Sequence, residues 1–198
     1  MPAHDVPPTA TGEPAEVTAL LLPVPGAEPL VDAWRRRYDP SATRGVPAHI
    51  TLLFPFLPLL ALSPAVLDRI RALLADHGPL EFDLAGVRRF PAGVLYLAPE
   101  PAAPIRALID AIVDAFPGYP PYGGAFVDIV PHLTVTDQAP PDVMVTVENA
   151  LVPRLPVRCR IREAWLMAGR EGAGPWRLVE RFALGPAART STSSSPGR

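Results

Sequence analysis

Two short segments of this chain are near-copies of one His-x-Thr phrase, and each has the alternating pattern of a β-strand. The copies, PAHITL and PHLTV, contain His49 with Thr51 and His132 with Thr134, and so hold two of the four histidines. Residues i and i+2 of a strand lie on the same face, roughly 6.5–7 Å apart. Each copy therefore presents an imidazole and a hydroxyl on one face and apolar side chains on the other. Two such pairs facing each other would place two proton-transfer groups and two hydroxyl donors around one substrate atom.

The elements predicted around the two histidines follow the same order, which indicates a duplicated unit. Alternation predicts strands, and apolar residues at helical spacing predict helices. The first set is a strand over Glu16–Pro23, a helix over Glu28–Tyr38, the His49 strand, a helix from the N-cap Ser63 to about Asp76, and a strand over Leu80–Phe90. The second set is a strand over Val94–Ala98, a helix over Ala103–Phe116, the His132 strand and a helix over Pro141–Ala150, followed by long strands over Val157–Ala168 and Trp176–Leu184.

This order predicts an α+β fold with two lobes, at about 15–90 and 91–186. Each lobe is expected to be an antiparallel-rich sheet with helices on its outer face, and the two His-x-Thr strands are expected to lie in a central cleft. Residues 1–14 and 187–198 lack apolar periodicity, so we expect flexible tails there. The predicted domain therefore spans 15–186.

Charge and cysteine content exclude several classes of function. A net charge of −2 and a pI near 6.1 argue against a protein that coats duplex nucleic acid, which needs a basic surface. A small phosphodiester or an RNA end remains compatible. Cys159 is the only cysteine, so we expect a buried side chain rather than a disulfide or a thiolate zinc site. The chain has no lysine, and contacts to anions therefore fall to arginine.

No segment has the pattern of a secretory signal or a membrane span. The start of the chain, Met1 to Pro14, lacks a basic stretch followed by an apolar one. The longest apolar run, Leu52–Leu62, is too short to cross a bilayer and is interrupted by prolines. We expect a cytoplasmic monomer that does not contact the membrane.

The paired His-x-Thr strands and the duplicated order resemble the 2H phosphoesterase superfamily, which includes bacterial 2′–5′ RNA ligase-like proteins and RNA 2′,3′-cyclic phosphodiesterases. The resemblance extends over roughly residues 15–186. It implies that His49 and His132 are the catalytic acid and base and that Thr51 and Thr134 hold the substrate phosphate. It also implies an enzyme that acts, without a metal or other cofactor, on a cyclic phosphodiester or 2′–5′ linkage in an RNA end or a small nucleotide.

The residue types fit that chemistry. Hydrolysis of a 2′,3′-cyclic phosphate needs a base for water, an acid for the leaving ribose oxygen, and donors for the phosphoryl oxygens. Histidine suits both proton roles because its pKa lies near neutrality. Threonine hydroxyls can donate to oxygens whose charge grows in the transition state. The sequence leaves open which histidine is the acid and which is the base.

The sequence departs from several RNA-processing members of that family, which carry an arginine directly after the second motif. Here Val135, Thr136 and Asp137 follow instead. Other side chains are candidates for substrate contacts, each with a purely structural alternative. The arginines Arg158, Arg160 and Arg162 alternate along a predicted strand, and either face the cleft or form a solvated face. The full set of candidates is Arg44, Arg88, Arg89, Arg158, Arg160, Arg162, Tyr119 and Tyr122.

Two other functions are compatible with the same residues. One is a non-catalytic module that binds a nucleotide or phosphate, and the other is a structural protein whose motifs are core strands. A metal site is disfavoured because no His-x-His or His-Glu-x-x-His motif occurs, which leaves only distant partners such as Asp128 or Asp137. The three tryptophans, Trp34, Trp165 and Trp176, are expected in the core.

Overall fold

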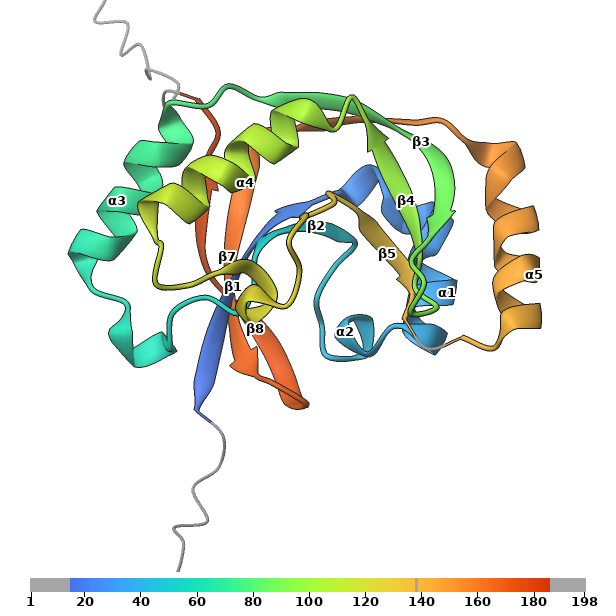
Figure 1. Ribbon diagram of the computed structural model, residues 1–198, viewed down its shortest axis with the longest axis horizontal. Helices are drawn as coiled ribbons and strands as arrows, with labels where there is room; N and C mark the ends of the chain where they lie inside the picture. Colours follow the sequence, from blue (N-terminus) through green and yellow to red (C-terminus); the bar gives the residue numbers. More distant parts are fainter. Residues whose placement is uncertain (1–14, 138, 186–198) are drawn as a thin grey trace, which may run out of the picture.

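The computed structural model describes residues 15–137 and 139–185, which form two four-stranded antiparallel sheets with helices packed against them (Figure 1). The strand order is β2-β1-β7-β8 in the first sheet and β5-β4-β3-β6 in the second. The strands are β1 (Glu16–Pro23), β2 (His49–Leu53), β3 (Leu80–Arg89), β4 (Leu95–Glu100), β5 (Leu133–Thr136), β6 (Val157–Ile161), β7 (Glu163–Arg170) and β8 (Ala173–Ala183). The predicted α+β class with two antiparallel sheets is confirmed. The predicted tails lie outside the described residues.

Five α-helices and four short 3-10 helices connect these strands within the described part of the chain. The α-helices are α1 (Glu28–Tyr38), α2 (Pro40–Thr43), α3 (Pro64–Ala75), α4 (Ala103–Ala115) and α5 (Pro141–Leu151). The 3-10 helices are η1 (Pro25–Ala27), η2 (Leu59–Ala61), η3 (Pro121–Gly124) and η4 (Val152–Arg154). Helix α3 begins as predicted, because the Ser63 side chain accepts a hydrogen bond from the Val66 N–H at 3.3 Å. None of the described helices is long and apolar enough to cross a membrane.

The two sheets are not the two halves of the chain. Strand β3 precedes residue 90 yet pairs with β4 and β6 in the second sheet, while β7 and β8 return to the first. The lobes predicted at about 15–90 and 91–186 therefore do not correspond to the sheets. The predicted order of strand, helix, His strand, helix and strand does occur twice, and the β7–β8 hairpin follows it.

The prediction of one strand over Val157–Ala168 is wrong, because the chain forms two strands there, in different sheets. In β6 the buried residues are Cys159 and Ile161, at odd positions, whereas the first buried residues of β7 are Ala164 and Leu166, at even positions. The buried side of the chain therefore changes at the exposed Arg162. The chain changes sheets at this point, because β6 pairs with β3 of the second sheet and β7 pairs with β1 of the first.

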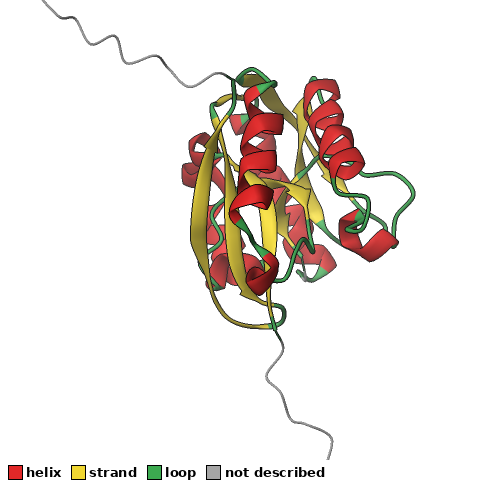
Figure 2. Cartoon of the chain, turned by 90° about the vertical axis from the view of Figure 1, so that its left-hand side faces the viewer, coloured by secondary structure: helices red, strands yellow, loops and turns green. Residues whose placement is uncertain are grey.

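Two of the helices follow a strand of one sheet and contact a strand of the other, and so connect the two sheets. Helix α1 follows β1 of the first sheet but contacts β5 of the second, and α4 follows β4 of the second sheet but contacts β2 of the first. Figure 1 accordingly shows α3 and α4 together on one flank and α1 and α5 on the other. Figure 2 shows the long strands with helices packed against them. One continuous apolar core contains residues of both sheets, such as Leu22 and Leu97.

Candidate active site

The two histidine strands meet where the two sheets adjoin. Strands β2 and β5 are each the edge strand of their sheet, and they contact each other, as Figure 1 shows near the centre of the molecule. His49 is the first residue of β2, and His132 immediately precedes β5. The charge of His132 contributes to lowering the pKa of His49, so the two rings lie within range of electrostatic interaction. The fold thus brings together the motifs that the sequence places far apart.

The alternation predicted for the motifs is present in both strands. The side chains of Ile50 and Leu52 are buried in β2, while His49 and Thr51 between them are only partly buried. In the second motif Leu133 and Val135 are likewise buried, and His132 and Thr134 are partly buried. Each strand therefore inserts its apolar residues into the core and leaves an imidazole and a hydroxyl on the accessible face.

Both histidine rings are held by the same kind of hydrogen bond. The Nδ1 atom of His49 lies 2.7 Å from the carbonyl oxygen of Pro47, and the Nδ1 atom of His132 lies 2.7 Å from that of Val130. A carbonyl oxygen only accepts hydrogen bonds, so Nδ1 carries the hydrogen in both rings. This fixes the tautomer, and it leaves Nε2 of each ring as the atom that can accept or donate a proton.

The two imidazoles differ in electrostatic surroundings. Burial and, to a smaller extent, the Arg35 guanidinium lower the pKa of His49 to about 4, against the opposing effects of the Pro47 carbonyl and the Asp39 carboxylate. Burial also lowers the pKa of His132, and the Val130 carbonyl opposes that effect. At neutral pH His49 is therefore firmly neutral and available as a proton acceptor.

Two aromatic rings that the sequence analysis did not single out enclose His132. The rings of Phe90 and Tyr96 stack on each other at 4.3 Å, and both lie edge-on to the imidazole at 5.0 and 5.5 Å. Tyr96 pairs with Thr134 across the β4–β5 ladder, so the tyrosine and the motif threonine share a face of the sheet. The Leu95-Tyr96-Leu97 sequence shows the position of Tyr96 as a strand residue, but nothing local shows its contact with His132.

Of the two candidate tyrosines, Tyr122 reaches the site and Tyr119 packs elsewhere. The ring of Tyr119 lies edge-on to Phe56 in the core at 5.6 Å. Tyr122 instead hydrogen-bonds with the side chain of Thr51, and burial outweighs this contact to raise the pKa of its hydroxyl. Its backbone N–H donates to the Phe54 carbonyl at 2.5 Å, and its φ of 53° lies in the left-handed region that non-glycine residues rarely adopt. Such backbone strain is concentrated at functional sites.

Most of the candidate arginines lie away from the histidines. Arg158 and Arg160 are on β6, the edge of the second sheet opposite β5, and form ion pairs with Asp83 at 3.8 Å and Glu81 at 3.1 Å. The Arg158 side chain is 92% exposed. These residues form the solvated strand face that was one of the two predicted alternatives. Arg162 is exposed between β6 and β7.

Arg88 lies near the second motif, on the same face of the sheet as Thr134. It pairs with Tyr96 across the β3–β4 ladder, and Tyr96 pairs in turn with Thr134. Directly opposed residues point to the same face, so Arg88, Tyr96 and Thr134 form a row across three strands. The neighbouring Arg89 forms an ion pair with Glu148 on α5. The backbone carbonyl of Arg44 accepts a hydrogen bond from the Trp176 N–H at 2.7 Å.

Three further expectations concern residues outside the site. Cys159 is buried as predicted, and burial raises the pKa of its thiol to about 11. The tryptophans are only partly buried and pack at the edges of the apolar clusters. In the described part of the chain, no group of three or more His, Cys, Asp or Glu side chains is arranged to hold a metal ion.

Comparison with known proteins identifies the family. A family model for the 2′-5′ RNA ligase superfamily matches residues 22–173, which include both motifs. The crystal structure of E. coli LigT in apo form shares 18% identity, covers 88% of this chain and 100% of that one, and gives a TM-score of 0.54. The crystal structure of TT0787 of Thermus thermophilus shares 20% identity, covers 86% and 100%, and gives 0.53.

A further crystal structure, described as a phosphoesterase, shares 15% identity, covers 88% of this chain and 100% of that one, and gives a TM-score of 0.52. No curated protein matches the sequence. At these identities the solved structures show a shared fold, whereas the family model spans most of the chain and both His-x-Thr strands. The chain belongs to the 2′-5′ RNA ligase superfamily, as its resemblance to the 2H phosphoesterases predicted.

Proposed function

We propose that this protein is a phosphoesterase that opens a cyclic phosphodiester by acid–base catalysis between His49 and His132. One observation carries the proposal: two imidazoles with matching Nδ1 hydrogen bonds lie at the starts of adjoining edge strands, and each offers Nε2 for proton transfer. Each is accompanied by a motif threonine on the same face. The substrate is a small phosphodiester or an RNA end with a 2′,3′-cyclic phosphate.

His49 is the base of the hydrolytic reaction and His132 the acid. The lowered pKa of His49, to which burial and the cationic Arg35 both contribute, keeps its Nε2 unprotonated. This atom takes a proton from water, whose oxygen attacks phosphorus. The bond from phosphorus to one ribose oxygen breaks in line, and that oxygen takes the proton from Nε2 of His132. Solvent then restores both protonation states.

The hydroxyl groups stabilise the phosphoryl oxygens. Thr51 and Thr134 donate to the non-bridging oxygens, whose negative charge grows in the transition state. If an RNA hydroxyl replaces water as the nucleophile, the same proton transfers join two ends through a 2′–5′ bond. Phosphate and 3′-AMP are named in structures of E. coli LigT, which shares this fold, and such ligands suit the proposed site.

The test is formation of product from excess 2′,3′-cyclic AMP, followed by chromatography with and without a chelator. We expect a ribose monophosphate ester at the same rate in both conditions, because the two histidines and water suffice for the chemistry. Binding of the nucleotide without any product would instead support a non-catalytic phosphate-binding module. Activity that is lost with chelator and restored by zinc would contradict the proposed mechanism.

A further inference from the structure

The three residues before His49 lie outside the β ladder and are held by other contacts. The last pair between β1 and β2 joins Pro23 to His49. Beyond it, the Ala48 carbonyl accepts from the Val24 N–H at 2.8 Å, and the Ala48 N–H donates to Oε1 of Glu28 at 2.5 Å. Pro47 has no N–H, and its carbonyl accepts from the His49 ring. The atom that fixes the tautomer of His49 therefore belongs to a segment held largely by side chains.

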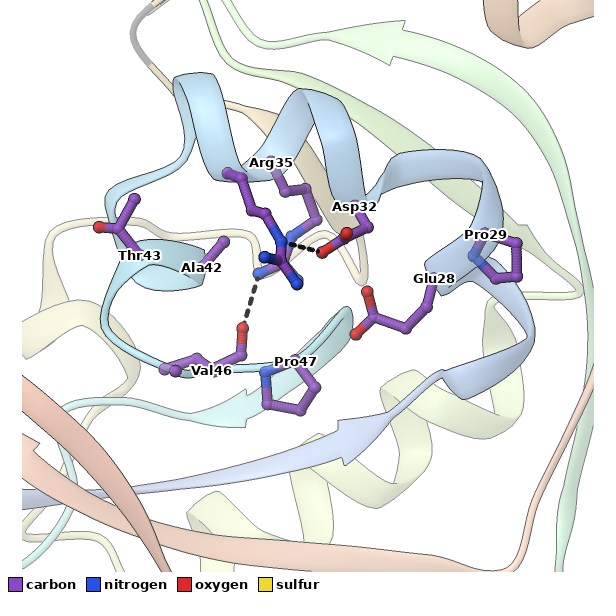
Figure 3. Close-up of a pocket in the computed structure, with 10 residues that line it drawn as sticks. Glu28, Pro29, Asp32, Arg35, Ala42, Thr43, Val46 and Pro47 are labelled. Atoms are coloured by element: carbon purple, nitrogen blue, oxygen red, sulfur yellow. Dashed lines mark hydrogen bonds and ion pairs between the residues drawn. The ribbon is translucent and has the colours of Figure 1, made fainter.

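Helix α1 supplies these side chains from both of its ends. Glu28 is its first residue, and Arg35, in its last turn, donates to the Val46 carbonyl at 3.3 Å. Arg35 is itself immobilised, because it is only 2% exposed and bonds to Asp39 and Ser41 at 3.1 Å each. Figure 3 shows Glu28 and Arg35 extending from the helix toward the chain at Val46 and Pro47.

The same helix also contacts the strand of the second motif. Helix α1 packs on β5, and the carbonyl of Tyr38 at its end accepts from the Asp137 N–H at 2.8 Å. One helix therefore contacts the backbone near both histidines. A cavity of about 760 Å³ beside this contact, lined by residues that include Glu28, Asp32, Arg36 and Pro47, leaves the segment room to shift if its hydrogen bonds are lost.

We propose that Glu28 is a positioning residue that fixes the His49 imidazole relative to His132. This inference rests on the proposed function for its catalytic consequence, but its structural part can be tested independently. Without the Glu28 acceptor the Ala48 N–H loses its partner, and the Pro47 carbonyl that orients the ring is no longer held. A displacement of about 1 Å in a catalytic group can cost 10²-fold in rate.

The experiment compares three variants of the full-length protein. Glu28→Ala removes the acceptor, Glu28→Gln keeps an oxygen at the same place without the charge, and Asp32→Ala changes a carboxylate that lines the same cavity but bonds to Arg36. With 2′,3′-cyclic AMP we expect Glu28→Ala to lower kcat about 10- to 100-fold with little change in KM, as for other residues that orient a catalytic group. Glu28→Gln and Asp32→Ala should stay close to wild type.

A second measurement does not depend on turnover. Nitrogen NMR of the His49 ring at neutral pH should show a hydrogen on Nδ1 in the wild type and in Glu28→Gln, and a mixture of tautomers in Glu28→Ala. If the wild type hydrolyses no substrate, the proposed function fails while this ring measurement still tests Glu28. An unchanged tautomer and unchanged kcat in Glu28→Ala would overturn the inference. An equal loss of kcat in Glu28→Gln would also overturn the inference, because a hydrogen-bonding role predicts that the amide oxygen preserves kcat.

Discussion

The imidazole of His132 lies edge-on to the ring of Phe90, with 5.0 Å between their centroids. Phe90 stacks in turn on Tyr96, so the catalytic candidate of the second motif is held by rings as well as by the Val130 carbonyl. Phe90→Ala removes one wall of this enclosure. An aromatic pair contributes about 0.5–1.5 kcal/mol, and we expect kcat to fall by up to about tenfold. Tyr96→Phe retains its ring and should stay near the wild-type kcat in the same assay.

Replacement of either motif histidine tests the acid–base pair directly. We expect His49→Ala and His132→Ala each to lower turnover of 2′,3′-cyclic AMP by about 10²–10⁴-fold, the usual contribution of a positioned proton-transfer group. His77→Ala is the control, because the His77 ring bonds to the Leu73 carbonyl at the end of α3. Rates near wild type in both motif variants would refute the mechanism.

The different surroundings of the two imidazoles predict an acidic optimum for kcat/KM. Below about pH 4 the base His49 becomes protonated, and the rate falls. As the pH rises through the pKa of His132, which burial lowers from its ordinary 6.5, the acid loses its proton and the rate falls again. Arg35→Met removes a cation that lowers the pKa of His49, so the acid limb should move to higher pH. A pH profile with no shift in that variant would contradict the assignment of His49 as base.

His49 also predicts how stability depends on pH. Its folded-state pKa of about 4 lies below the unfolded value of 6.5, so between these values the unfolded chain binds more protons. Stability therefore falls as the pH falls from about 6.5 to 4, by about 3 kcal/mol at most for this group. Urea unfolding at several pH values measures the loss, which should be smaller in His49→Gln. An identical pH dependence in that variant would show that His49 does not contribute.

The hydroxyl of Tyr122 bonds with the side chain of Thr51, which predicts a contribution to substrate binding beside the first motif. Tyr122→Phe removes that hydroxyl and keeps the ring contact with Phe126. A hydrogen bond of this kind contributes about 1 kcal/mol, so we expect kcat/KM to fall several-fold. Tyr119→Phe, on a ring packed against Phe56, should behave as wild type. Equal effects of the two changes would count against a specific role for Tyr122.

Local patterns predicted much of this fold because they depend on nearest neighbours in the chain. The predicted limits of β1 and α1, Glu16–Pro23 and Glu28–Tyr38, match the structure, and the Ser63 cap is present. The alternation of the two motifs could also be predicted, because it requires only that each strand bury one of its two faces. The split at Arg162 was missed although the change in parity from Ile161 to Ala164 is visible in the sequence, because both halves have strong strand character.

The assignment of strands to sheets and the surroundings of His49 depend on tertiary structure. Arg35 and its neighbours Arg36 and Arg37 form a uniform cationic run in the sequence, yet Arg35 is buried and bonds to the Val46 carbonyl while the other two are exposed. Helical phase places one of the three against the segment before His49. No local sequence pattern indicates that the segment before His49 lies beside this helix, because its position depends on the pairing of β2 with β1.

The candidate arginines give the last prediction, since their positions in the second sheet separate them clearly. Arg88 lies in one row with Tyr96 and Thr134, whereas Arg158 is on the opposite edge strand and pairs with Asp83. Several RNA-processing members of the family carry an arginine directly after the second motif, and the Arg88 guanidinium, on the same face as Thr134, can take its place. A hydrogen bond to a charged group contributes about 1.5–3 kcal/mol. We expect Arg88→Ala to raise KM for 2′,3′-cyclic AMP roughly 10- to 100-fold and Arg158→Ala to leave it unchanged. The reverse result would place the phosphate near β6, at the edge of the sheet opposite β5, and would contradict a phosphate site held by both motif threonines.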